Sequence, residues 1–228
     1  MTAPTRPKEQ RDPAVRAPHT AGKTIRWARL YDLGTTLLSF GTLAALHRTI
    51  VGLAGIRPGQ RILDVGCGPG RLALVAATAA GPGVEVRGID PVPEMIELAR
   101  GRVARARAPA RFDVGVIEAL PFPDEQFDVV LSALMLHHLP DDLKRRGLAE
   151  IYRVLKPAGR VVAVDFGATP RDGLGHFLCV LRLRTGQDHA ERIRDMVREA
   201  GFEAVETGPT RHRAIAFVRG RKPLAVRA

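Results

Sequence analysis

Arg61-Ile62-Leu63-Asp64-Val65-Gly66-Cys67-Gly68-Pro69-Gly70 joins a short apolar run to three closely spaced glycines. The apolar run predicts a buried parallel strand, because strands covered on both faces are nearly continuous in Val, Ile and Leu. The glycines predict a sharp turn that a ligand can approach closely, since they carry no Cβ. A helix should begin just after the turn, near Leu72. This order of strand, glycine turn and helix is typical of a nucleotide site.

A second strand sharpens this interpretation. Glu85-Val86-Arg87-Gly88-Ile89-Asp90 ends in a carboxylate 20 residues after Gly70. In a doubly wound sheet, an acid at about this spacing reaches a ribose hydroxyl. The two strands together predict a site for a ribose-containing ligand.

Four more blocks follow along the chain, and together they carry a family resemblance. They are Glu118-Ala119-Leu120-Pro121-Phe122-Pro123-Asp124, Phe127-Asp128-Val129-Val130, Leu136-His137-His138-Leu139-Pro140-Asp141 and Tyr152-Arg153-Val154-Leu155-Lys156-Pro157-Ala158-Gly159-Arg160. With the two strands above, the chain from about residue 31 to residue 166 resembles the class I S-adenosylmethionine-dependent methyltransferases. It is most similar to the methyltransferase type 11 branch, which holds the quinone-biosynthesis C-methyltransferases.

The resemblance implies a Rossmann-like α/β fold: a seven-stranded, mostly parallel sheet with one antiparallel edge strand, helices on both faces and an N-terminal helical lid. The hydrophobic pattern also alternates between strands and helices. Strands are expected at residues 61–65, 85–89, 111–116, 127–132 and 160–165, with a hairpin at 202–207 and 213–219. Helices are expected at 72–80, 93–106, 142–155 and 189–200. The expected division is a disordered tail over residues 1–23, a helical lid over 24–58 and a cofactor-binding core over 59–228.

Length and composition bound the class of protein. A chain of 228 residues with 45% hydrophobic and 26% charged residues suits one soluble domain with a short extension. Cys67 and Cys179 make no disulfide framework, and the start of the chain lacks the apolar core of a secretion signal. The apolar stretch 37–56 is interrupted by His47 and Arg48, so no membrane span is expected. These features predict a cytoplasmic protein.

The net charge of +11 raises the question of an anionic partner. The excess is mostly arginine, spread between Arg6 and Arg227, and aromatic residues make up only 5% of the chain. A base-stacking platform for nucleic acid is therefore not expected. Peripheral membrane contact stays open, because residues 37–56 are apolar and the end of the chain is basic. The expected partner is a small-molecule acceptor, and the expected oligomeric state is a monomer or a homodimer.

The resemblance assigns the glycine turn to the amino-acid end of S-adenosylmethionine, whose product is S-adenosylhomocysteine. Gly66, Gly68 and Gly70 should wrap this end of the cofactor. The backbone of Cys67 should face the ligand while its side chain fills space. Asp64 should orient the turn and the cofactor's ammonium group.

Asp90 should accept both ribose hydroxyls, because an ionised carboxylate can accept from a diol with its two oxygens. The resemblance also implies a contact of Tyr31 in the lid with the cofactor carboxylate. For Tyr31 and for Met95, core packing is the competing interpretation. The other contacts implied are Pro91 and Met95 near the adenosine and Ser132 and Ala133 under the sulfonium.

The adenine side departs from the usual pattern of the family. Val116 stands where an aspartate commonly receives the adenine amino group. The backbone of Ile117 can still serve the ring, and the loss of one hydrogen bond costs about 1 kcal/mol. Glu118 is a candidate substitute; an outward orientation, or a cap on the next turn, is its alternative interpretation.

His137 and His138 follow the fourth predicted strand, where cofactor and acceptor should meet. An unperturbed imidazole pKa of about 6.5 suits proton removal at neutral pH, so either histidine is a candidate general base. The competing interpretation is that the pair only shapes the cofactor pocket. No spacing typical of metal ligands occurs in the sequence.

The sequence therefore predicts a methyltransferase that acts on O, N or C of a small organic molecule, either natural-product-like or quinone-like. Residues 167–187 should build much of the acceptor pocket. One alternative is an enzyme that methylates a lipid or phospholipid at a membrane surface. A second alternative is a fold that binds S-adenosylmethionine without transferring its methyl group.

Overall fold

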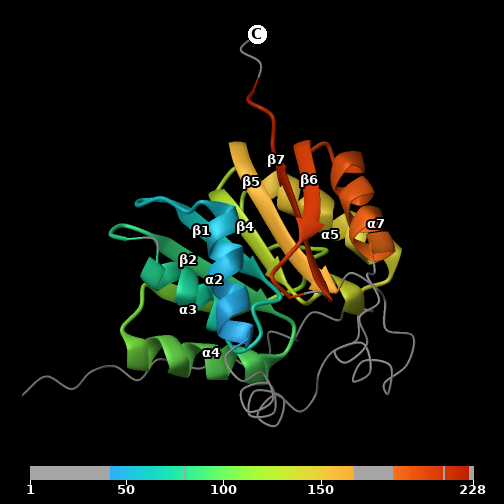
Figure 1. The fold of residues 1–228 in the computed structure, drawn as a ribbon. Helices are drawn as coiled ribbons and strands as arrows, with labels where there is room; N and C mark the ends of the chain where they lie inside the picture. Colours follow the sequence, from blue (N-terminus) through green and yellow to red (C-terminus); the bar gives the residue numbers. More distant parts are fainter. Residues whose placement is uncertain (1–41, 80, 167–186, 213, 226–228) are drawn as a thin grey trace, which may run out of the picture.

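The computed structural model describes residues 42–79, 81–166, 187–212 and 214–225, which form a seven-stranded sheet covered by helices (Figure 1). The strand order is β3-β2-β1-β4-β5-β7-β6. The expected α/β sheet is confirmed. The strands are β1 Arg61–Val65, β2 Glu85–Asp90, β3 Ala110–Val114, β4 Phe127–Ala133, β5 Leu155–Phe166, β6 Glu203–Pro209 and β7 Ile215–Arg221.

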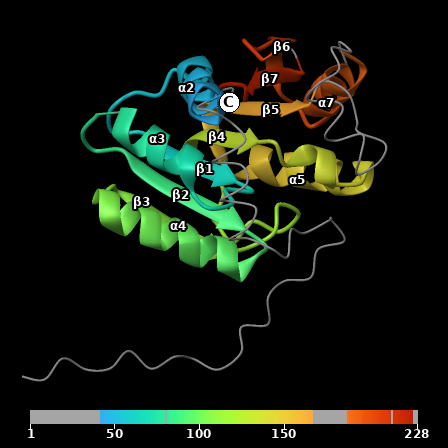
Figure 2. The same ribbon diagram turned by 60° about the horizontal axis from the view of Figure 1, so that its bottom comes forward.

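Helices cover both faces of the sheet, with α2 to α4 on one side and α5 and α7 on the other (Figure 2). Successive strand residues point to opposite faces, so Ile62 packs with the first group of helices and Leu63 with the second. Both side chains are fully buried. The helices are α2 Thr42–Ala54, α3 Arg71–Ala79, α4 Pro93–Ala106, α5 Asp141–Val154 and α7 Gln187–Glu199, with a short 3₁₀ helix η1 at Leu136–His138.

The strand order reverses at β1, which pairs in parallel with β2 on one side and with β4 on the other. The connections from β1 to β2 and from β4 to β5 therefore run in opposite directions along the sheet. Ligands of open α/β sheets bind at such a reversal, outside the carboxyl ends of the strands. The fold thus places a binding site where β1, β2 and β4 end.

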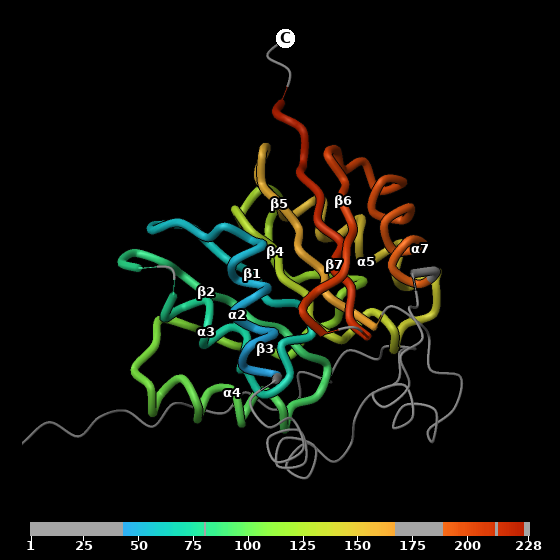
Figure 3. The backbone as a smooth tube through the Cα atoms, viewed as in Figure 1, coloured from blue at the N-terminus to red at the C-terminus, as the bar shows by residue number. Residues whose placement is uncertain are grey.

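Antiparallel pairing is confined to one edge of the sheet, as expected. β7 runs antiparallel to both β5 and β6, and β6 is the outermost strand. Figure 3 shows α7 beside this pair, joined to it through the short connection into β6. Val197 of α7 and Val218 of β7 belong to the same buried cluster.

The fifth strand begins earlier than predicted. It starts at Leu155, directly after α5, whereas the sequence predicted a helix to residue 155 and a strand from residue 160. Phe127 pairs with Leu155 but Val129 pairs with Arg160, so β5 bulges against β4. Ala158 has a φ of +62° within the bulge, and its N–H donates to the carbonyl oxygen of Lys222 at 3.0 Å. Proline and glycine are tolerated at bulges, which is why they do not end the strand here.

The described part of the expected lid, α2, packs on the sheet. Leu46 and Ile50 are fully buried against α3, β4 and β5. The apolar side chains of residues 43–56, the described part of the stretch that suggested membrane contact, therefore pack in or against the core. No helix among the described residues is long and apolar enough to cross a membrane. Residues 24–41, with Tyr31, and residues 167–186 lie outside the described part, so the lid and the acceptor-pocket segment stay predictions.

His47 makes the stability of the fold depend on pH. Burial, with a smaller contribution from the charge of Arg71, lowers the pKa of His47 to about 4. An unfolded chain protonates this side chain near its ordinary pKa of about 6.5, so the unfolded state binds more protons between these two values. Stability is thus lost as the pH falls from about 6.5 to about 4, by about 3 kcal/mol in total.

The variant His47→Leu should lack this part of the pH dependence. Urea unfolding of both proteins at about pH 7.5 and about pH 5 measures the difference, since other titrating groups contribute equally to both. An equal loss of unfolding free energy in the two proteins would contradict the assignment.

Candidate functional site

The three glycines of the turn have left-handed backbones with φ values of +69°, +50° and +75° at Gly66, Gly68 and Gly70. Their surroundings differ. A Cβ on Gly66 would collide with the side chain of Met135, and one on Gly70 would lie 2.8 Å from the Cβ of Ala99. A Cβ on Gly68 would meet no atom of the described residues within 4 Å. Among the described residues, Gly68 is thus the one of the three glycines whose Cβ side is open, whereas Gly66 packs against Met135 and Gly70 against Ala99.

Asp90, at the end of β2, fixes this turn. Its Oδ2 accepts the N–H of Gly68 and its Oδ1 accepts the N–H of Val92, both at 2.9 Å. Burial raises the pKa of Asp90, and the two N–H groups oppose that rise. Each oxygen of an ionised carboxylate accepts more than one hydrogen bond, so Asp90 can hold the turn and still accept from a ligand. Arg102 of α4 braces the turn from outside by donating to the carbonyl oxygen of Pro69.

Asp64, in β1, is the second carboxylate beneath the turn. It is 1% exposed, and its Oδ2 accepts no hydrogen bond from the described residues. Burial raises the pKa of Asp64 to about 7; the backbone N–H of Ala73 opposes the rise and Asp90 adds to it. Burial and these two carboxylates also raise the pKa of the Cys67 thiol, which suits a side chain that only fills space.

The adenine-side residues lie after β3, in a segment that bonds to Asp90 through the N–H of Gly115 and the Asp90 carbonyl oxygen at 3.1 Å. Val116 and Ile117 are each 5% exposed. The Ile117 side chain fits against Gly147 of α5, where a Cβ would collide with it. The Ile117 side chain thus packs in the core, and Val116 is buried next to it in the chain. One oxygen of Glu118 is enclosed without a hydrogen bond from the described residues, so it can accept one.

Two side chains of α5 hold the end of this segment. Glu150 accepts the N–H of Leu120 at 2.8 Å. Arg153 donates to the carbonyl oxygens of Leu120 and Phe122 at 3.1 and 2.8 Å, and it pairs with Glu150. The backbone of this segment is therefore fixed both through an N–H group and through carbonyl oxygens.

Pro91 and Met95 stand at the start of α4. Pro91 is half-buried, whereas Met95 is 3% exposed and lies on the buried face of the helix. Met95 therefore occupies the position that the core-packing interpretation gave it, and Pro91 remains accessible beside Asp90.

The carboxyl end of β4 carries Ser132 and Ala133 into the same region. Ser132 is 2% exposed, and its Oγ has no hydrogen-bond partner among the described residues. Leu134 then takes a left-handed backbone with φ +54°, held by its N–H donating to Val164 at 2.8 Å. This conformation is uncommon and costly for a bulky side chain such as leucine, so the surrounding structure must hold it. It turns Met135 over Gly66 and leads the chain into η1.

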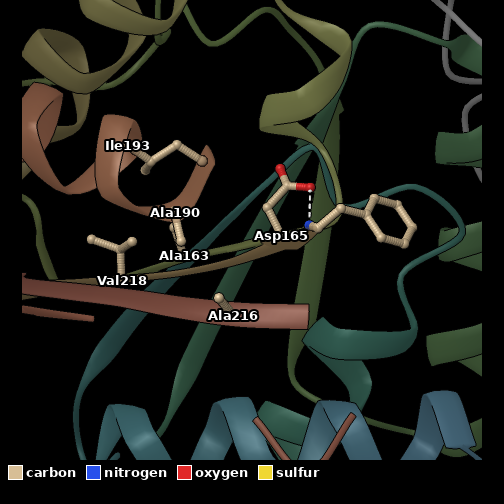
Figure 4. Close-up of a pocket in the computed structure, with 7 residues that line it drawn as sticks. Ala163, Asp165, Ala190, Ile193, Ala216 and Val218 are labelled. Atoms are coloured by element: carbon tan, nitrogen blue, oxygen red, sulfur yellow. Dashed lines mark hydrogen bonds between the residues drawn. The ribbon is translucent and has the colours of Figure 1, made fainter. Parts of the chain in front are cut away.

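His137 of η1 is joined to Asp165 at the end of β5. The Nδ1 of His137 lies 2.6 Å from Oδ1 of Asp165, and its backbone N–H donates to Oδ2 at 2.9 Å. Oδ1 also accepts the N–H of Phe166 at 2.7 Å. Figure 4 shows Asp165 bordering a small apolar cavity between β5, β7 and α7. His138 contacts the His137 ring, with centroids 3.9 Å apart, but the carboxylate holds His137.

Sequence reasoning did not identify Asp165. The sequence pattern that could have identified it is an acidic residue near the end of β5, the strand that pairs with β4. Asp165 follows Val164, the partner of Ala133 in that pairing. Tyr31 lies outside the described residues. The other predicted site residues gather at the carboxyl ends of β1 to β4. No group of three or more His, Cys, Asp or Glu side chains in the described ranges is arranged to hold a metal ion.

The arrangement fits S-adenosylmethionine. An enclosed carboxylate oxygen on Asp64 and the largely buried carboxylate of Asp90 offer acceptors for an ammonium group and a ribose diol. The open side of Gly68 lies between them in the chain and admits a close approach. The reason to choose one ribose-containing cofactor over another comes from the relatives of the chain.

Comparisons with known proteins supply that reason. Residues 62–159 match the family described as "Methyltransferase domain". The chain is 33% identical to the demethylmenaquinone methyltransferase of Deinococcus radiodurans over 213 residues, 82% of this chain and 83% of that protein. It is 40% identical to that of Thermus thermophilus over 145 residues, 64% of each protein. An arsenite methyltransferase of Halobacterium salinarum is 38% identical over 68% of this chain and 40% of that protein. The chain thus spans less than two thirds of the last two relatives.

Solved structures share the fold. The [4+2]-cyclase SpnF superposes with a TM-score of 0.64 at 21% identity, over 79% of this chain and 82% of that one. Phosphoethanolamine N-methyltransferase 2 of Haemonchus contortus, solved with S-adenosyl-L-methionine, gives a TM-score of 0.64 at 21% identity, over 78% of this chain and 52% of that one. With the sheet order, the glycine turn and the sequence relatives taken together, the chain belongs to the class I S-adenosylmethionine-dependent methyltransferases and uses S-adenosylmethionine as its cofactor.

Proposed function

We propose that the chain methylates O, N or C of a small organic molecule, and that its acceptor is a quinol-like or similarly acidic molecule that loses a proton in the reaction. Two observations support the acceptor class. Several relatives are named demethylmenaquinone methyltransferases. His137, held by Asp165 at 2.6 Å, lies just after the carboxyl end of the strand next to the cofactor turn and is the base that we propose. A base is needed only where the acceptor must give up a proton.

Each residue of the site has its own role in the proposed reaction. The cofactor supplies an electrophilic methyl group on a sulfonium. Asp90 and the Gly68 backbone would hold the ribose and the amino-acid end of the bound cofactor, and Asp64 would accept from its ammonium group. Ser132 and Ala133 close the site at the end of β4. His137 receives the acceptor proton at Nε2, because its Nδ1 is committed to Asp165. Alignment and exclusion of water provide the remaining acceleration, worth several kcal/mol.

A cofactor-binding fold without methyl transfer remains the second candidate, since the similar structure SpnF is named a cyclase. Incubation with isotope-labelled S-adenosylmethionine and a panel of quinols, phenols, carbon acids and amines distinguishes the two. We expect label in a quinol or phenol product. Label only in amines would contradict the proposed acceptor class, and tight cofactor binding without any labelled product would favour the second candidate.

The contrast between Gly68 and Gly70 predicts separable effects on binding and folding. Both residues have positive φ, so an alanine at either position carries similar strain, about 1 kcal/mol. Gly70→Ala adds a collision with Ala99. We expect Gly68→Ala to lower the unfolding temperature by only about 2–4 °C while raising the Kd for S-adenosylhomocysteine about tenfold or more. Gly70→Ala should lower the unfolding temperature more. Thermal unfolding and calorimetry measure both, and equal Kd values for Gly68→Ala and wild type would be evidence against ligand approach there.

A further inference from the structure

Asp64 is a carboxylate in an interior position of a parallel sheet. It lies opposite Gly88 of β2 and Leu131 of β4, so strands flank it on both sides. Only 1% of the residue is exposed. An ionised carboxylate in such a position is costly unless hydrogen bonds or an opposite charge compensate for the lost water.

The described surroundings provide little compensation. The Oδ2 atom accepts no hydrogen bond from the described residues, and the backbone N–H of Ala73, in the first turn of α3, is the hydrogen-bond donor acting on the carboxylate. Among the described residues, the titratable groups that interact electrostatically with Asp64 are Asp90 from β2 and Cys67 from the turn, and neither is a cation. From β4 the neighbouring residues are Leu131 and Ser132, which do not titrate near neutral pH. Arg71 of α3 acts electrostatically on His47 of α2.

We propose that Asp64 carries a proton in the cofactor-free protein and releases it to solvent when the cationic amino-acid end of the cofactor binds. The inference rests on the cofactor assignment and adds that binding exchanges a proton for a ligand charge. In this step the O–H bond of the Asp64 carboxyl breaks and its proton passes to solvent. The resulting carboxylate forms one ion pair with the cofactor's ammonium group. The enclosed Oδ2 is the atom that gains a partner.

The environment of the free protein supports this. Burial raises the pKa of Asp64 to about 7, and a bound cation would return it toward its ordinary range. Because the proton must leave Asp64 before the cofactor binds, the affinity for the cofactor increases with pH up to about 7 and is constant above it. Well below pH 7 the slope should approach about tenfold per pH unit. Asp90 is the competing source of the proton, because burial also raises its pKa.

Calorimetry with S-adenosylhomocysteine tests this, because the heat of proton release depends on the buffer. Titrations in phosphate and in a buffer of large ionisation enthalpy should show about 0.9 proton released at about pH 6, about half a proton near pH 7 and almost none at about pH 8. Equal heats in the two buffers at every pH would overturn the proposal while leaving cofactor binding intact. Failure to bind at any pH would instead overturn the cofactor assignment.

Variants locate the proton. Asp64→Asn should abolish proton release, and Asp113→Asn, on a half-exposed strand residue of β3, should release as many protons as wild type. Proton release retained in Asp64→Asn would assign it to Asp90 and overturn the proposal. If Asp64→Asn binds S-adenosylhomocysteine too weakly for calorimetry, the unfolding temperature of the cofactor-free variant tests the proposal instead. Without cofactor, the unfolding temperature of Asp64→Asn relative to wild type should be higher at about pH 8.5 than at about pH 5, because the wild-type carboxyl must ionise inside the sheet. No change in that difference with pH would contradict the proposal.

Discussion

Asp165→Asn is expected to lower kcat about 10²-fold while changing the Kd for S-adenosylhomocysteine by less than about threefold. Asp165 accepts from three donors: the ring Nδ1 and backbone N–H of His137 and the backbone N–H of Phe166. Asparagine has one acceptor oxygen and an NH₂ group, so it leaves at least one of these donors facing another donor. Either the η1 backbone loosens, or His137 changes to the tautomer with its proton on Nε2, which cannot accept the acceptor proton.

Two further measurements separate this role from a structural one. His137→Gln should lower kcat by about 10²–10⁴-fold, and His138→Gln by less than about tenfold, because in the described part of the chain Asp165 bonds to His137. Nitrogen chemical shifts of labelled histidines should show His137 protonated at Nδ1 in wild type and altered in Asp165→Asn. An unchanged His137 tautomer together with full activity of His137→Gln would mean that the acceptor needs no base.

Local patterns in the sequence were sufficient for the cofactor side of the site. β1, the glycine turn and β2 with its terminal Asp90 each lie within about one supersecondary unit, where residue type and spacing determine the backbone. Their boundaries agree with the structure to within one residue for both strands. The sequence alone could not show why glycine is required at positions 66 and 70. The side chains that crowd these positions, Met135 and Ala99, come from distant parts of the chain.

The part of the site around His137 and Asp165 depended on contacts between separate strands. Asp165 meets His137 only because β5 pairs with β4 and because Leu134 turns the chain through a left-handed backbone. Nothing in the residue type of Leu134 predicts that conformation, which leucine rarely adopts. The early start of β5 had the same kind of cause, since the pairing of Ala158 with Lys222 is a contact between positions far apart in the sequence. Sequence patterns thus located the strand ends, while the tertiary pairing selected which side chains meet there.

Asp90→Ala is expected to raise the Kd for S-adenosylhomocysteine at least about 100-fold, about 3 kcal/mol. The carboxylate has two functions that alanine removes together. It accepts the N–H groups of Gly68 and Val92, which shape the turn, and it is the acceptor proposed for the ribose hydroxyls. Hydrogen bonds to a charged acceptor contribute about 1.5–3 kcal/mol each, so even one lost ribose contact accounts for much of the effect.

Asp90→Asn separates the two functions. Its single amide oxygen can still accept one of the two backbone N–H groups, but the side chain no longer has two acceptor oxygens for the ribose diol. We expect an intermediate Kd for this variant. Titration with the 2′-deoxy form of the ligand should cost wild type about tenfold in affinity and cost Asp90→Ala almost nothing, since the partner of the missing hydroxyl is already gone. If the deoxy form loses the same affinity in both proteins, the ribose is held elsewhere. Circular dichroism and thermal unfolding of each variant show whether weak binding reflects the missing contact or a displaced turn, and a folded Asp90→Ala protein with wild-type affinity would exclude Asp90 as the ribose acceptor.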